Sequence, residues 1–181
     1  MSDFARHYLE ATLVLLRGQK RLAERAFAQL EPADFHLTID AEANSIAVLI
    51  KHMWGNMRSR WGAFLESDGE KLDRHRDAEF VDDIEALEPL MELWEEGWGY
   101  VFTALEMLSP EDLLSTVTIR GKPHTVLEAI QRQVSHYAYH LGQIVMLAKH
   151  IRGESWRTLS IPRGRSQAFN ESLGYRREEN G

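Results

Sequence analysis

Two histidines four residues apart, His136 and His140, have the type and spacing best suited to binding a metal ion. On a helix this spacing places both imidazoles on one face, one turn apart, where they can share an ion. Both fall at one margin of an apolar stripe, where a neighbouring helix would meet them. Pairs of this kind also arise by chance, so the pair alone is only a weak indication of a metal site.

A third histidine, His52, lies at the edge of the apolar stripe of another expected helix. Helical bundles build interior metal sites from side chains on facing helices, so the three histidines together favour one site. The alternative for His52 is a partly buried imidazole hydrogen-bonded to a neighbour. The remaining histidines have no comparable partner and are interpreted as surface or loop residues: His7, His36, His75, His124 and His150.

Three neutral imidazoles would leave a bound ion with open coordination positions, because the sequence offers no obvious fourth ligand. An open site can lower the pKa of bound water, or bind and deprotonate a thiol. Imidazole suits Zn, Ni and Fe(II), so the ligand type does not select the metal. Asn56 and Gln143 are candidates to orient the rings of His52 and His140. The alternative for each is an ordinary polar residue near a helix surface.

The composition of the chain narrows the possible functions. Its 181 residues, 44% hydrophobic and 27% charged, suit one globular domain. A formal net charge of −7 argues against a nucleic-acid partner. No apolar run approaches the ~20 residues that span a bilayer, and the start lacks the order of a signal peptide. We therefore expect no membrane partner and a cytoplasmic location. The chain has no cysteine, hence no disulfide and no thiolate of its own.

Apolar periodicity predicts an all-α fold, an up-down-type four-helix bundle with an irregular C-terminal tail. Helices are expected at about 4–30, from 44–45 to the apolar residues near 64, at about 84–108 and at about 125–151. Pro89 predicts either a kink or a helix start nearby. Residues 116–119 are expected to be a short extended piece rather than a sheet. The first helix is expected to bury one set of residues: Tyr8, Ala11, Leu15, Leu22, Ala26 and Phe27.

The tail, residues 156–181, is expected to pack on the same domain as the bundle of residues 1–155. It carries apolar side chains that a disordered segment would not need: Trp156, Leu159, Ile161 and Phe169. We expect residues 161–169 to fold back over the bundle end nearest the metal. Arg163 or Arg165, with help from Arg120, would then reach an anionic cosubstrate. The alternative is a solvated loop.

Two motifs in the sequence resemble the DinB-like and YfiT-like superfamily of metal-binding four-helix bundles. They are NSIAVLIKHMWGN (44–56) and SHYAYHLGQI (135–144). The superfamily's pattern, one histidine in the second helix and a pair in the fourth, maps onto His52, His136 and His140. Some branches have an acidic residue at the place of His136, so the all-histidine set is nearer the YfiT and thiol S-transferase side. Four further segments resemble a narrower, uncharacterised branch: DGEK (68–71), RDAEF (76–80), TIRG (118–121) and SIPRG (160–164).

The resemblance implies a divalent metal ion and a small-molecule substrate. Members of the superfamily include enzymes that transfer a low-molecular-weight thiol to an electrophile, and an isomerase that depends on such a thiol. A thiol cosubstrate would fit a chain that has no cysteine. The alternatives are a metal-dependent hydrolase and a non-catalytic metal-binding stress-response protein. The resemblance also implies a homodimer, and the many large aromatics of the third expected helix favour one.

Overall fold

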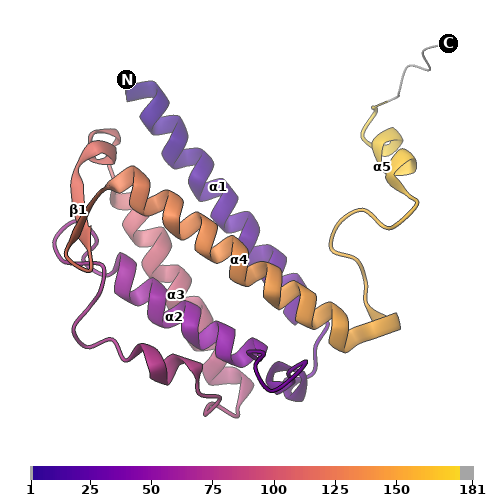
Figure 1. The fold of residues 1–181 in the computed structure, drawn as a ribbon. Helices are drawn as coiled ribbons and strands as arrows, with labels where there is room; N and C mark the ends of the chain where they lie inside the picture. The colour runs from indigo at the N-terminus through magenta and orange to yellow at the C-terminus, as the bar shows by residue number, and fades with distance from the viewer. Residues whose placement is uncertain (1, 176–181) are drawn as a thin grey trace.

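The computed structural model describes residues 2–175 as a bundle of four long helices, with a hairpin at one end and a tail at the other (Figure 1). The four helices are α1 (Ser2–Phe27), α2 (Ile46–Trp61), α3 (Leu87–Met107) and α4 (Val126–Arg152). The predicted all-α fold class is confirmed. Shorter elements occupy the connections and the tail: η1 (Pro32–His36), η2 (Arg76–Phe80), η3 (Pro110–Leu114), η4 (Gly153–Ser155) and α5 (Ser166–Ser172).

The long helices begin where the sequence provides capping groups. Ser45 caps α2, and its hydroxyl accepts the backbone N–H of Val48 at 3.2 Å. Thr125 caps α4 in a reciprocal capping box with Glu128. Pro89 lies in the first turn of α3, where its missing N–H costs no hydrogen bond. The proline therefore marks a helix start and not a kink.

The buried face of α1 differs from the predicted one. Leu15 is 49% exposed, and Ala11 and Leu22 are also exposed. Ala26 and Phe27 are buried as expected, and the rest of the buried face consists of Leu9, Thr12, Leu16 and Ala23. The segment has apolar residues over much of its circumference, so its periodicity fits more than one rotation of the helix about its axis.

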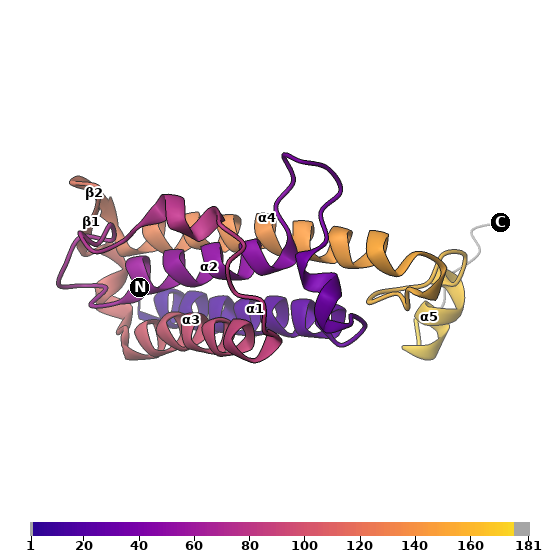
Figure 2. The ribbon, with the colours of Figure 1, turned by 90° about the horizontal axis from the view of Figure 1, so that it is seen from below.

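α2 and α3 run in the same direction, because the chain between them first returns along α2 (Figure 2). This pair therefore departs from the up-down arrangement that was expected, in which consecutive helices run in opposite directions. We call residues 62–86 the crossover segment. Near its start, the backbone N–H of Lys71 donates to the hydroxyl of Ser59 at the end of α2. Near its end, Asp82 accepts a hydrogen bond from the hydroxyl of Ser45, the residue that caps the beginning of α2. The crossover segment covers the side of α2 that the other helices leave open, so α2 is buried almost all round.

A β-hairpin joins α3 to α4, so the expectation of an extended piece without a sheet is wrong. Strands β1 (Thr116–Ile119) and β2 (Lys122–Thr125) pair antiparallel. Arg120 and Gly121 form the turn with φ values of 56° and 70°, as a two-residue type I′ turn requires. Asp68 of the crossover segment accepts both of their backbone N–H groups, at 2.8 and 2.7 Å. β2 contains a proline and has no apolar alternation, which is why the sequence pattern did not reveal it.

The tail packs on the bundle only in its first part. Trp156 and Leu159 contact the hydrophobic core, whereas Phe169 is 42% exposed and Ile161 is also exposed. Residues 161–175 lead away from α4 (Figure 1). The expectation that residues 161–169 fold back over the bundle end nearest the histidines is therefore wrong. The backbone N–H of Arg157 donates to the side chain of Gln29, which fixes the tail beside the segment that follows α1. Within residues 2–175, no helix has the length and apolar character needed to cross a membrane.

Gly97 allows α3 to approach α2 closely. A Cβ atom at this position would lie 3.0 Å from Met57 Sδ and 3.3 Å from the Cα of Trp54. We therefore expect Gly97→Ala to lower the free energy of unfolding by about 1–3 kcal/mol in urea titrations. Gly99→Ala is the matched control, because a Cβ there meets nothing within 4 Å. Equal destabilisation by both variants would contradict this account of the α2–α3 contact.

Candidate metal centre

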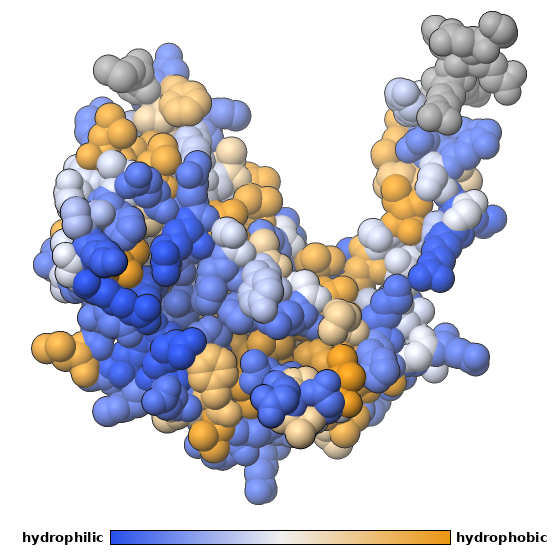
Figure 3. Space-filling model, viewed as in Figure 1, coloured by the Kyte–Doolittle hydropathy of each residue, from blue (hydrophilic) through white to orange (hydrophobic). Residues whose placement is uncertain are grey.

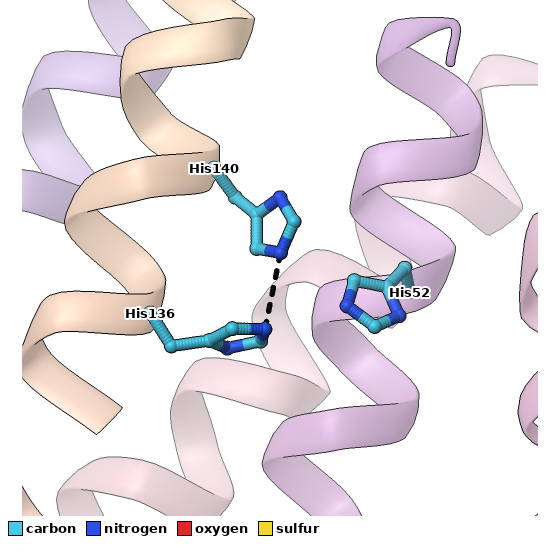
Figure 4. Close-up of side chains that lie close together, drawn as sticks. All are labelled: His52, His136 and His140. Carbon is cyan, nitrogen blue, oxygen red and sulfur yellow. Dashed lines mark hydrogen bonds between the residues drawn. The ribbon is translucent and has the colours of Figure 1, made fainter. Parts of the chain in front are cut away.

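His52 of α2 and His136 and His140 of α4 turn toward a common point between the two helices (Figure 4). The Nε2 atoms of His136 and His140 are 3.0 Å apart. The ring centroid of His52 lies 5.4 Å from that of His136 and 4.9 Å from that of His140. The three histidines singled out in the sequence thus meet in one cluster.

The cluster has dimensions that suit a single metal ion. One nitrogen from each ring lies within 4.8 Å of the other two. Nitrogens that share an ion at ~2.1 Å are at most ~4.2 Å apart, so small side-chain movements suffice to close the site. Within residues 2–175, no carboxylate or further histidine joins the three. A bound ion would therefore keep open coordination positions.

Glu79 holds the ring of His52, a role that the sequence analysis missed. His52 Nδ1 lies 2.9 Å from Glu79 Oε2. Glu79 belongs to η2 of the crossover segment and is only 5% exposed. Arg74 donates to the same carboxylate from Nε at 2.7 Å and from a terminal nitrogen at 2.9 Å. No spacing rule relates residues 52 and 79, since only the path of the crossover segment brings them together.

The carboxylate of Glu79 is stabilised in its ionised form. Burial alone would raise its pKa, but hydrogen bonds from His52 and Arg74 and the charge of Arg74 lower the pKa on balance. The ionised carboxylate accepts a hydrogen bond from the Nδ1–H of His52, so the Nε2 of that ring is left free to bind an ion. Metal-binding histidines commonly have such an acidic partner.

Gln143 and Asn56, the two residues expected to orient the rings, have different contacts. The side-chain oxygen of Gln143 lies 2.8 Å from His140 Nδ1, the contact expected of an orienting residue. Asn56 faces the same cavity, but its oxygen accepts the hydroxyl of Tyr137 at 3.3 Å. Gln143 therefore has the geometry of an orienting residue, whereas Asn56 contacts Tyr137.

The two α4 histidines are held in the neutral form that binds metals. Burial is the main cause that lowers the pKa of His136 to about 3, and the neighbouring imidazoles of His140 and His52 lower it further. Burial also lowers the pKa of His140. Neutral imidazoles have a lone pair available for an ion, so no proton must leave these two rings at neutral pH.

The histidines form part of the wall of a cavity of about 750 Å³ between α2, α4, the crossover segment and the hairpin. Arg120 lines this cavity, whereas Arg163 and Arg165, which were expected near the metal, lie in the exposed tail outside it. Hydrophilic side chains dominate the face of the molecule where α2, α4 and the hairpin meet (Figure 3). Five arginines line the cavity, and only Arg120 among them was singled out from the sequence: Arg60, Arg74, Arg76, Arg120 and Arg132.

Residues 3–165 match DUF1572, a family of proteins of unknown function. The chain belongs to the DUF1572 family. No curated protein and no solved structure gives a significant match. The matched range includes the three histidines, Glu79 and all the arginines of the cavity. In this DUF1572 protein the three-histidine cluster therefore lies within the residues that match the family.

Gly55 provides the space that Glu79 occupies, because a Cβ atom at residue 55 would overlap the Glu79 carboxylate. We expect Gly55→Ala and Glu79→Gln each to weaken metal binding ~10–100-fold, since the first displaces the Glu79 carboxylate from His52 and the second removes its negative charge. Competition with a chromogenic chelator measures this affinity. Gly142→Ala is the matched control, because a Cβ on that part of α4 meets nothing within 4 Å. Wild-type affinity in both test variants would exclude an orienting role for Glu79.

Proposed function

We propose that this protein is a metal-dependent enzyme that transfers a small thiol to an electrophile. The observation that carries the proposal is the three-histidine cluster on the wall of a cavity of about 750 Å³. A purely structural ion is usually enclosed by four protein ligands, whereas catalytic sites keep a position for water or substrate. The cavity gives a small molecule access to that position.

The chain's own residues would prepare the site in three ways. Glu79 and Gln143 orient two of the imidazoles, and burial keeps His136 neutral. A divalent ion bound there would act as a Lewis acid that lowers the pKa of a thiol or of water. Because the chain has no cysteine, the thiol would come from a cosubstrate. A reduced thiol cosubstrate is in keeping with a cytoplasmic location.

We also propose that this DUF1572 protein is related to the DinB-like and YfiT-like superfamily. The support is a ligand set with one histidine from the second long helix and two from the fourth. Zn, Ni and Fe(II) all remain candidates for the ion, because imidazole suits each of them.

Two alternatives use the same residues. A hydrolase would activate water in place of a thiol, at the same open position. A non-catalytic metal-binding stress-response protein would hold the ion without turnover. The size of the cavity beside the histidines favours the two enzymatic functions over the binding one.

A homodimer is our further proposal for this chain. The aromatics of α3 do not support it, because Trp94 and Trp98 are buried in the bundle core. Support for a dimer comes from the face of α1 that points away from the core, where Val14 is 69% exposed and Leu15 and Leu22 are also exposed. Exposed apolar side chains at helical spacing suit a contact with a second copy of the chain.

Removal of one ligand tests the metal centre. We expect the wild-type protein, purified without added metal, to retain a divalent ion in elemental analysis, and His140→Ala to lose most of it. The matched control is His150→Gln, a change to an exposed histidine of the same helix. We also expect metal-loaded wild type, but not His140→Ala, to conjugate a small thiol to 1-chloro-2,4-dinitrobenzene. Full metal content in His140→Ala would refute the ligand assignment. Bound metal without turnover on any thiol or ester would favour the non-catalytic alternative.

Sedimentation velocity tests the dimer. At micromolar concentration we expect a species of twice the 20.9 kDa chain mass. The double variant Val14→Glu/Leu15→Glu should sediment as a monomer, because it places charges on the proposed contact. Its circular dichroism should remain helical, since neither side chain is part of the core. A wild-type protein that sediments only as a monomer would contradict the proposal.

A further inference from the structure

The cavity beside the histidines has a strong positive charge in a chain of net charge −7. Five arginines line it, and no acidic residue of the described chain does. A cleft lined by one sign of charge concentrates ligands of the opposite sign. The charge of the cavity is thus opposite to that of the chain as a whole, which points to a ligand and not to general surface composition.

Three of the arginines contact carboxylates of the protein. Arg60 donates to Glu70 at 2.9 Å, and Arg74 forms its paired hydrogen bonds with Glu79. Both arginine side chains are deeply buried, 5% and 3% exposed. Arg120 shares the carboxylate of Glu70 at 3.1 Å. Two carboxylates therefore balance five guanidinium groups.

The remaining two arginines have no acidic partner within residues 2–175. Arg76 of η2 has its guanidinium carbon 5.1 Å from the ring centroid of Phe80. Arg132 projects from α4, one turn before His136. Both are exposed and line the cavity. Their donors are free to bind a ligand.

The backbone fixes the position of Arg120. Its positive φ of 56° is held by the hydrogen bond from its N–H to Asp68. The neighbouring N–H of Gly121 donates to the same carboxylate. This double contact fixes the hairpin turn at the rim of the cavity and reduces the entropy that Arg120 loses when it binds a ligand.

Gln133 is a second and independent indication of a ligand. It lines the cavity and is only 3% exposed, yet its buried Oε1 has no hydrogen-bond partner in the described protein. A buried amide oxygen without a partner is costly, so such groups usually meet a ligand or an ordered water. A polar atom of a small molecule in the cavity would satisfy it.

We infer that the substrate of this site is a small molecule with a carboxylate or phosphate group, which Arg76, Arg120 and Arg132 bind. Guanidinium groups bind both anions through paired N–H donors. The reacting end of the molecule faces the three histidines, and only this part of the inference rests on the proposed function. The arginines of the tail play no part in it.

Titration calorimetry of the metal-free protein with inorganic phosphate and with succinate tests the anion site. We expect Arg76→Gln/Arg132→Gln to weaken binding about tenfold or more, because charge-assisted hydrogen bonds are lost. Arg163→Gln/Arg165→Gln removes the same charge from the tail and should bind like wild type. Arg132→Gln alone, at an exposed helical position, should weaken binding without any effect on the fold. The tighter of the two probes identifies the anion as phosphate or carboxylate.

Equal weakening in the cavity and tail variants would show a general charge effect and overturn the inference. Unchanged binding in Arg132→Gln and in the cavity double variant would overturn it as well. The metal centre is tested separately, since His140→Ala should bind phosphate like wild type while it loses metal. A failure of the anion test would therefore leave the metal assignment intact. A failure of the metal test would likewise leave the anion site intact.

Discussion

The buried carboxylate of Glu79 connects the crossover segment to the bundle, and the orientation of His52 in the candidate metal centre depends on this contact. Burial of an unpaired charge costs several kcal/mol, so Glu79 is stable there only because Arg74 and His52 occupy its oxygens. Gly55 supplies the matching space on α2. One ionic group thus holds the returning chain on α2 and sets the orientation of a ligand ring.

Much of the architecture could be predicted from local patterns. Apolar periodicity located the four helices, and the expected starts near residues 45 and 125 coincide with the caps Ser45 and Thr125, since capping is a short-range effect. The spacing of His136 and His140 placed both rings on one helix face. His52 could be added because its position at the edge of an apolar stripe placed it toward a neighbouring helix.

What could not be predicted depends on contacts between distant segments. The link between Glu79 and His52 exists only because the crossover segment doubles back along α2. The rotation of α1 was misjudged because Leu15 and Leu16 are equally apolar, and only the packed bundle decides which of them is buried. The tail arginines were placed near the metal on the strength of apolar neighbours, but Gln29 holds the start of the tail beside the end of α1.

The cavity opens on the side of the bundle, and its wall combines two kinds of structure. The three histidines and most of the other lining residues come from α2 and α4, whereas Arg76, Phe80 and Arg120 come from η2 and the hairpin turn, which are surface connections. Connections tolerate exchange of residues far better than packed helices do. Exchanges at the exposed positions of these connections, such as Arg76 and Arg120, could therefore alter the charge of the cavity while Glu79 and the histidine cluster stay unchanged.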